Sequence, residues 1–176
     1  MTRPNNQPFD PLFTFRFELS FTEQPLPGGS DAGKLSPPLA GAFSECTGLE
    51  ATMEPKVIKA GGYNYGALQR VGPVTFATVV LKRGISRDGR LFKWFERVST
   101  GDYGHRCTVR IQLKALPEPP GKEPVVKLAW RLEKAMPIKF KAADFNARTT
   151  EVGIEELHLA HEGLFLELPQ QSGGTS

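Results

Sequence analysis

Hydrophobic and polar residues alternate along several segments of the chain. In LFTFRFELSF, residues 12–21, every odd-numbered residue from Phe13 to Phe21 is apolar and every even-numbered one between them is polar. Successive side chains of a strand point to opposite faces of a sheet, so this pattern predicts a half-buried antiparallel strand. Weaker versions of the pattern predict strands at residues 42–53, 55–59, 74–82, 107–113, 126–132, 136–140 and 152–160.

One segment has the period of a helix instead. In DGRLFKWFERVSTG, residues 88–101, the apolar residues Leu91, Trp94, Phe95 and Val98 recur at the spacing of one helix face. Asp88 is the predicted N-cap, and Gly101 is predicted to end the helix. The apolar face predicts that the helix packs on a sheet as part of the core.

Segments rich in proline, glycine and serine separate these elements. Residues 22–41 predict a long insert loop, residues 60–73 an extended loop or hairpin arm, and residues 117–124 the turn of a hairpin. Residues 169–176 predict a flexible tail. Many short strands and one helix predict a mainly β sandwich or barrel, with the helix covering one end of a single domain, residues 1–176.

Composition changes this picture little. Lys and Arg number 22 against 19 Asp and Glu, and the two signs are interleaved, which favours a solvated surface over a nucleic-acid-binding patch. Cys46 and Cys107 are far apart and fit small buried side chains in a reducing cytosol. The N-terminal residues have no apolar core of a signal peptide, and no apolar run reaches the ~20 residues of a membrane helix, so assembly in the cytoplasm without a lipid anchor is expected.

Residues 28–35, GGSDAGKL, match the body of a phosphate-binding loop. Such a loop needs Ser or Thr after the lysine and a helix that begins there. Leu35 occupies the hydroxyl position, and Pro37 and Pro38 follow it closely. We therefore interpret the match as coincidental and predict no nucleotide site.

His158 and His161 are the strongest candidates for metal binding. Three residues apart, they share a face of a helix but point to opposite faces of a strand. The segment TTEVGIEELHL, residues 149–159, begins with β-branched residues and a glycine, which favours a strand with one irregularity, whereas a helix is the weaker alternative. His105 is the only other imidazole available as a zinc ligand. We predict no metal site and no cofactor.

Signatures of catalysis are also missing from the sequence. It has no G-x-S-x-G or H-E-x-x-H motif and no cysteine with an obvious base partner. Asp88 and Asp102 could suggest a carboxylate pair, but the first fits a helix cap and the second a turn. We therefore predict that the protein is not an enzyme.

The order of several short segments resembles a known family. They are FSECTGLEAT (43–52), GGYN (61–64), LKRGIS (81–86), LFKWFERV (91–98) and VGIEELHLAHEGL (152–164). Together they resemble the tail tube proteins of contractile phage tails, and above all the tube proteins of extracellular contractile injection systems. The resemblance runs from about residue 12 to residue 164. It implies two packed antiparallel sheets that form a β-barrel-like core with one flanking helix.

The resemblance also implies how the protein works. Six copies would form a ring, and rings would stack into a hollow inner tube within a contractile sheath, bounded by baseplate and tube-cap proteins. Cargo or a tape-measure protein would occupy the channel of a virion-like or released particle. Relatives make ring-to-ring contacts through the loop after the third strand, which corresponds here to Gly61, Gly62, Tyr63, Asn64, Tyr65 and Arg70.

Three alternatives stay open. Tube-initiator proteins at the baseplate share the fold, so the position along the particle is undecided. A metal-dependent hydrolase centred on His158 and His161 is the second alternative. A nucleic-acid-binding β-barrel is the third, although it needs exposed aromatics beside Lys and Arg, whereas the alternation turns most Phe side chains inward.

Overall fold

The computed structural model describes residues 12–27, 43–59, 61–62, 65–115, 124–148 and 150–169. Its elements, in chain order, are β1 (Phe17–Glu23), β2 (Glu45–Thr47), β3 (Ala51–Met53), β4 (Lys56–Ile58), β5 (Leu68–Arg70), β6 (Val74–Phe76), β7 (Val79–Gly84), α1 (Arg90–Ser99), β8 (Cys107–Ala115), β9 (Val125–Lys141), β10 (Ile154–Ala160) and β11 (Gly163–Glu167). The candidate phosphate loop, residues 28–35, and most of the predicted insert lie outside the described residues.

The body is one folded-over sheet with the strand order β1-β8-β9-β10-β7-β2, and β11 also pairs with β9. Every pairing is antiparallel. Strand β9 is 17 residues long; its first part pairs with β8 and β11, and its last part pairs with β10. The change of partner falls close to Lys134, whose φ of 49° is the only positive one among the described non-glycine residues.

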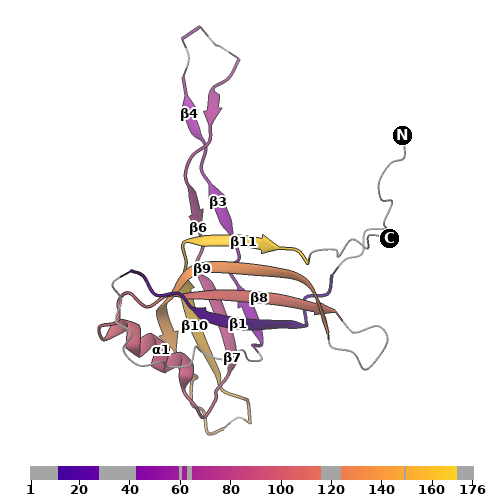
Figure 1. Cartoon of the computed structure of the whole chain (residues 1–176), viewed down its shortest axis with the longest axis vertical. Coiled ribbons are helices and arrows are strands. Elements are labelled where there is room, and N and C mark those ends of the chain that lie inside the picture. The colour runs from indigo at the N-terminus through magenta and orange to yellow at the C-terminus, as the bar shows by residue number, and fades with distance from the viewer. Residues whose placement is uncertain are drawn as a thin grey trace.

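The strand β9 therefore belongs to two layers. Half-sheet A contains β1, β8, the first part of β9 and β11, and half-sheet B contains the end of β9 with β10, β7 and β2. The two layers and the flanking helix are visible in Figure 1. The predicted fold class, mainly β with two packed antiparallel sheets and one helix, is confirmed, although the described strands do not close into a barrel within one chain.

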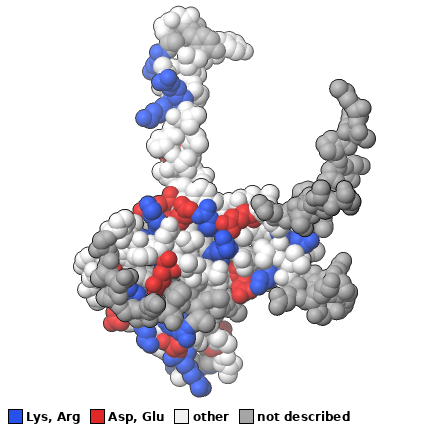
Figure 2. Space-filling model, viewed as in Figure 1, with Lys and Arg blue, Asp and Glu red and all other residues white. Residues whose placement is uncertain are grey.

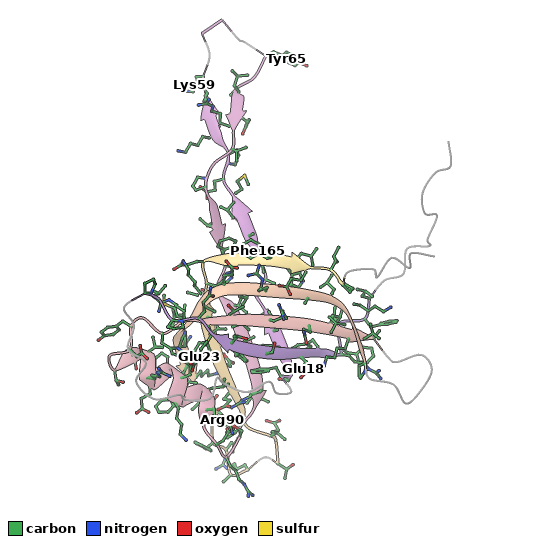
Figure 3. All side chains as sticks on the ribbon, in the orientation of Figure 1. Glu18, Glu23, Lys59, Tyr65, Arg90 and Phe165 are labelled. Atoms are coloured by element: carbon green, nitrogen blue, oxygen red, sulfur yellow. The ribbon has the colours of Figure 1, made fainter. Side chains whose placement is uncertain are left out.

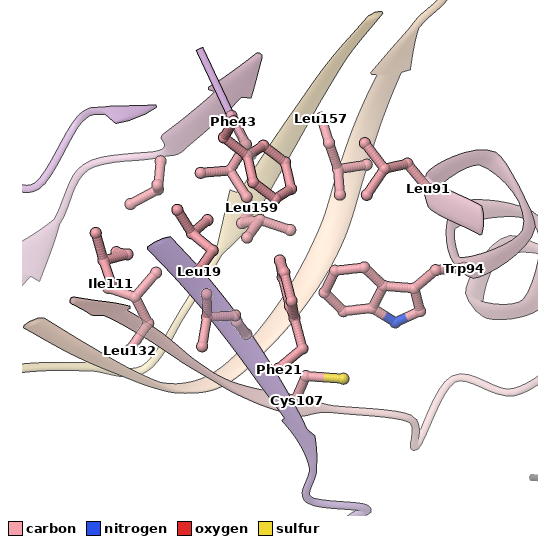
Figure 4. Packing of buried hydrophobic residues seen from close by; sticks show 14 residues of the cluster. Leu19, Phe21, Phe43, Leu91, Trp94, Cys107, Ile111, Leu132, Leu157 and Leu159 are labelled. Carbon is pink, nitrogen blue, oxygen red and sulfur yellow. The ribbon is translucent and has the colours of Figure 1, made fainter. Parts of the chain in front are cut away.

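The core lies between the half-sheets (Figure 4). Leu19, Val109 and Leu132 from half-sheet A meet Leu157 and Leu159 from half-sheet B, and all five are fully buried. Complete burial of a large apolar side chain contributes roughly 1.5–3 kcal/mol before entropy is counted. This apolar layer is what holds the two halves of the sheet together.

The helix closes one end of that core. Leu91 and Trp94 are buried, and Phe95 and Val98 pack against the core while partly exposed. The helix begins one residue later than the capping pattern predicts. Gly89 is the N-cap with a left-handed φ of 58°, and Asp88 instead forms ion pairs with Arg90 and Arg83.

The first strand is shorter than the alternation predicts. It begins at Phe17, which pairs with Leu113 near the end of β8, so Phe13 and Phe15 have no neighbouring strand in the described part of the chain. Their side chains are 75% and 69% exposed. The alternation of apolar and polar residues therefore continues beyond the paired part of β1.

Two other strand predictions are wrong in detail. The predicted strand 42–53 is divided into β2 and β3 at Gly48, whose φ is 84° and where a Cβ would lie 2.1 Å from the carbonyl oxygen of Thr78. The predicted strands 126–132 and 136–140 are one continuous β9. Strand β11, which begins at Gly163, was not predicted from the sequence.

Candidate assembly surfaces

A long hairpin, which we call the arm, stands away from the body (Figures 1 and 3). It consists of two short ladders in line, β3 with β6 and then β4 with β5. Between them Gly72 lies so close to Glu54 that a Cβ would be 1.8 Å from the Glu54 carbonyl oxygen. The predicted loop 60–73 is thus the outer part of an arm that begins at Ala51 and ends at Phe76.

The predicted stacking residues lie on the outer part of this arm. Gly61 and Gly62 are in the turn at its tip, where Gly62 has a φ of 87°, and Arg70 is the last residue of β5. Tyr65 is also at the tip and is 97% exposed (Figure 3). Tyr63 and Asn64 lie outside the described residues. The arm therefore presents the described members of this set to solvent, but they do not form a pocket.

Like charges lie opposite one another on the arm. Lys56 and Arg70 are direct cross-strand partners, and Ile58 and Leu68 are the next partners on the same face. Like charges at opposed positions destabilise a strand pair. No described carboxylate forms an ion pair with Lys56, Lys59 or Arg70. Figure 2 shows these cations as an isolated group on the arm.

The base of the arm rests on the corner between β10 and β11. The ring of His161 lies against Phe76 with 5.1 Å between centroids, and its Nδ1 is 2.9 Å from the carbonyl oxygen of Gly163. Burial lowers the pKa of His161. A neutral imidazole with its proton on Nδ1 donates to that carbonyl, so His161 acts as a structural contact at the root of the arm.

The solvent face of half-sheet A has charges that neutralise one another. Arg131 forms ion pairs with Glu133 and with Glu167 at 2.7 Å, and Arg110 also pairs with Glu167 at 2.8 Å. The hydrogen bond that Arg131 donates to the Glu133 carboxylate is the main reason that the pKa of Arg131 is raised. Lys114 pairs with Glu18 on the neighbouring strand. This face is polar, but each of these charges is already partnered within the chain.

Half-sheet A has two unpaired edges. Among the described residues β1 pairs only with β8, and β11 pairs only with β9. Exposed apolar side chains lie next to both edges: Phe13 and Phe15 precede β1, while Phe165 and Leu166 are 44% and 48% exposed on β11. Exposed edges with apolar residues are sites at which another chain can add strands. Sequence reasoning missed the second edge because it missed β11.

Two polar clusters are buried and serve the fold. Arg83 and Glu155 are cross-strand partners whose Nε and Oε1 atoms are 2.6 Å apart. At the helix, Trp94 donates its Nε1–H to Nδ1 of His105 at 2.9 Å, and His105 Nε2 lies 3.5 Å from a carboxylate oxygen of Glu23. Both clusters join elements that are distant in sequence. Neither cluster lines a cleft formed by the residues that the structure describes.

The histidines considered as metal ligands diverge. His158 lies within β10 beside Glu156, with its Nε2 3.6 Å from Oε2, whereas His161 follows the strand and contacts the arm. Among the residues that the structure describes, no three His, Cys, Asp or Glu side chains are grouped closely enough to hold a metal ion. The described part of the segment is a strand with a register shift after His158, as the sequence favoured.

The cysteines take no part in a reactive group. Burial raises the pKa of Cys46 to about 11 and that of Cys107 to about 12, so both thiols are protonated at neutral pH. The thiolate is the reactive form of cysteine.

The described region contains a single helix of 10 residues and hence no helix that is long and apolar enough to span a bilayer.

Comparison with solved structures finds the same fold in contractile injection particles. A chain of the anti-feeding prophage baseplate, solved with six-fold symmetry, is 25% identical with a TM-score of 0.72, and the match covers 92% of this chain and 98% of that one. A chain of the sheath–tube complex of the extracellular contractile injection system PVC is 15% identical with a TM-score of 0.69, over 90% and 92% of the two chains. A chain of the anti-feeding prophage cap is 16% identical with a TM-score of 0.69, over the same shares.

Among curated proteins no match to the sequence was found. The model of the family described as T4-like virus tail tube protein gp19 matches residues 13–165. This match confirms the resemblance on which the sequence interpretation rests, and it covers the body, the helix and the arm. The chain therefore belongs to the T4-like virus tail tube protein gp19 family and is a structural protein rather than an enzyme.

Proposed function

We propose that this protein is the subunit of the inner tube of a contractile injection system, in which six copies form a ring and rings stack around a central channel. The observation that carries the proposal is the family match over residues 13–165, a span that includes two open sheet edges and a projecting arm. The six-fold symmetry of the baseplate that contains the 25% identical chain supports a ring of six.

Lateral joining within a ring is proposed to use the edges of half-sheet A. The strand order β1-β8-β9-β11 is antiparallel throughout, so β1 and β11 run in opposite directions. The β11 edge of one copy and the β1 edge of the next therefore have the directions that a further antiparallel pair requires. The exposed Phe13 and Phe15 beside one edge and Phe165 beside the other would be covered by this junction.

Stacking of rings is proposed to use the arm. It projects along the long axis of the molecule and presents Tyr65, Ile58 and Leu68 to solvent. Exposed aromatic and aliphatic residues on a projecting element are typical anchors of interfaces. Gly61 and Gly62 at the tip let the backbone approach a neighbouring ring closely, and the same role is proposed for Tyr63, Asn64 and Arg70.

The proposed tube works as a passive conduit. Its channel holds cargo or a tape-measure protein, and a contractile sheath surrounds it between a baseplate and a cap. The particle is assembled in the cytoplasm and released or carried as a virion-like structure. These partners are proposed from membership of the tail tube family.

A second candidate function is the tube initiator at the baseplate. It is favoured by one observation, namely that the solved chain with 25% identity comes from a baseplate. An initiator binds the tube on one side only. The two functions differ in a simple way: a tube subunit stacks with copies of itself, whereas an initiator stops at a single ring.

The proposal is tested by electron microscopy and light scattering of the full chain across a range of concentrations. Rings of six with a central channel are expected, and stacks of rings identify a tube subunit. Phe165→Lys with Leu166→Lys places cations on the β11 edge, where they block strand addition, and is expected to leave folded monomers. Lys93→Glu on the exposed face of the helix is the matched control. A wild-type chain that stays monomeric at every concentration would contradict the proposal.

A further inference from the structure

The arm leaves the body as a narrow ribbon of two strands (Figures 1 and 3). Among the described residues its strands pair only with one another, β3 with β6 and β4 with β5. At the root, the amide of Ala77 donates to the carbonyl oxygen of Glu50 at 3.1 Å and holds the two chains of the ribbon together. A ribbon that is joined to the body at one end can tilt unless a further contact fixes its direction.

One histidine supplies such a contact from the body. His161 follows β10 at the corner that leads into β11, and its ring lies 5.1 Å from that of Phe76, the last residue of β6. Within the described ranges this is the one aromatic contact between the arm and the body. Nδ1 of the same ring is 2.9 Å from the carbonyl oxygen of Gly163, the first residue of β11. The imidazole therefore connects the root of the arm with the corner of the body.

The site of His161 suits a neutral ring. With its proton on Nδ1, the ring donates to Gly163, while Nε2 is buried and has no hydrogen-bond partner among the described residues. A second proton would add a positive charge to this buried ring, and burial disfavours the charged form of a histidine. Burial accordingly lowers the pKa of His161, and the backbone groups of Gly163 and Ala77 offset this only in part.

No described carboxylate stabilises a charge on His161. None lies within ion-pair distance of its ring nitrogens, whereas Nε2 of His158 on β10 is 3.6 Å from Glu156. The charged side chains on the elements that adjoin His161 have partners of their own: Glu162 with Lys134, Glu133 with Arg131, and Glu50 with Thr52. A protonated His161 would therefore be stabilised better by water than by the packed corner.

A docked arm and a released arm consequently differ in their affinity for a proton. When the arm tilts away from the corner, His161 is hydrated and its pKa returns toward the value of about 6.5 of an exposed histidine. For each unit by which the pKa in the docked arm lies below that value, full protonation shifts the equilibrium about tenfold toward the released arm. The shift begins as the pH falls through the pKa of the released form and is complete below the pKa of the docked form.

We propose that His161 is the positioning residue of the arm: the neutral ring holds the arm in the direction shown in Figure 1, and protonation of the ring releases it. Phe76 supplies the face on which the ring rests. This inference goes beyond the proposed function, because it concerns a single chain and gives the direction of the arm a dependence on pH. Where rings stack through the arm, stacking is then weaker in mild acid than at neutral pH.

The test measures the spread of distances between the arm and the body by pulsed electron paramagnetic resonance. Spin labels are attached to Gln69→Cys on β5 and Lys93→Cys on α1, both at exposed positions, in the full chain diluted with unlabelled chain. The raised pKa values of Cys46 and Cys107 keep the natural thiols protonated and unreactive. We expect a narrow distribution of distances at about pH 7.5 and a broader one at about pH 5.5. Labels on Lys93→Cys and Gln112→Cys, both on the body, are the control and give the same distribution at both pH values.

Substitutions at the contact separate a proton-sensitive residue from one that is merely structural. His161→Phe keeps a ring against Phe76 but cannot bind a proton, so its distribution is expected to stay narrow at both pH values. His161→Ala removes the ring and is expected to give the broad distribution at both. Phe76→Ala removes the contact from the side of the arm and is expected to do the same. His158→Gln, on the neighbouring strand, is the matched control and keeps the wild-type response to pH.

Two results would overturn the inference: a wild-type distribution that is the same at both pH values, or a response of His161→Phe equal to that of the wild type. Neither measurement requires rings, so the inference can fail while the proposed tube stands, and a chain without rings can still show the released arm. Thermal unfolding at both pH values verifies that each variant is folded. If His161→Ala does not fold, Phe76→Ala provides the same test, because it leaves the corner of the body unchanged.

Discussion

Trp94 donates its indole N–H to Nδ1 of His105 across 2.9 Å, and both rings are buried where the helix meets the chain leading into β8. Because Nδ1 accepts this hydrogen bond, the neutral imidazole has its own proton on Nε2, 3.5 Å from Glu23. A second proton can be added only at Nδ1, at the expense of the bond from Trp94. The hydrogen bond from Trp94 therefore favours the neutral form of His105 in the folded protein.

The pair predicts that acid destabilises the fold through His105. Burial and the nearby Arg97 lower the pKa of His105 below 6.5, and the Glu23 carboxylate offsets this only in part. Below that value the unfolded chain binds a proton that the folded chain does not, so the free energy of unfolding falls as the pH decreases. The contribution of a neutral His105 to the free energy of unfolding is fully present when the pH is above the pKa of this histidine in the unfolded chain.

Urea unfolding between about pH 7.5 and 5.5 measures this dependence. His105→Gln keeps an acceptor for Trp94 but cannot bind the proton, so its stability is expected to fall less with decreasing pH than that of the wild type. The remaining slope includes His161, whose pKa is also lowered by burial. Equal slopes for the two proteins would contradict the assignment.

A second prediction concerns the Phe-rich first strand, in which Leu19 and Phe13 occupy equivalent positions of the alternation. Leu19 is fully buried, whereas Phe13 is 75% exposed. Leu19→Ala is expected to lower the free energy of unfolding by about 2–5 kcal/mol through a cavity, and Phe13→Ala to change it by less than about 0.5 kcal/mol. Chemical denaturation of the two variants checks this, and similar losses would show that Phe13 is packed in solution.

A third prediction concerns the buried pair of Arg83 and Glu155. Removal of the carboxylate in Glu155→Ala leaves a buried guanidinium and is expected to cost about 3–5 kcal/mol. Ser86 and Asp88 also contact Arg83, so they limit the loss. The matched control is the exposed pair Lys134 and Glu162, for which Glu162→Ala is expected to cost about 0–1 kcal/mol. Double-mutant cycles measure the coupling energy of each ion pair. Equal coupling energies for the buried and the exposed pair would contradict this prediction.

A fourth prediction concerns the backbone of the arm. Gly72→Ala places a Cβ 1.8 Å from the Glu54 carbonyl oxygen, so the ladders of the arm have to move apart at this point. We expect thermal unfolding of the body to change little and stacking of rings to be lost. Gly84→Ala, outside the arm, is the control, because the added Cβ would meet only Cγ1 of Val152 at 3.5 Å and the residue has no positive φ. Stacking by Gly72→Ala at the wild-type level would mean that the arm tolerates the distortion or is not used.

The sequence predicted those elements whose hydrophobic periodicity is visible within their own residues. The helix followed from the spacing of Leu91, Trp94 and Val98, β8 followed from alternation, and β10 followed from alternation with one irregularity. The fold class could be inferred because strand patterns recur along the chain and only one segment has the period of a helix. The strand interpretation of the histidine segment was right for the same reason.

Features set by distant partners were not predictable. Alternation could not show that β1 begins only at Phe17, because the start of a strand depends on where it pairs with its neighbour, here at Leu113 of β8. Strand β11 lies in the apolar run LFL, which has no alternation, and its place is fixed by pairing with β9. The opposition of Lys56 and Arg70 depends on the register across the arm, which residue spacing alone does not determine.

The direct continuation of the arm into the body has a mechanical consequence. Only Ala77 and Thr78 separate β6 from β7, and β7 lies between β10 and β2 in half-sheet B. A pull or push along the arm is therefore applied along β7 and loads the hydrogen bonds on both of its sides in shear, all at once. Because β9 belongs to both half-sheets, the force passes through β9 from half-sheet B into half-sheet A. The whole subunit therefore resists a force along the arm as one unit.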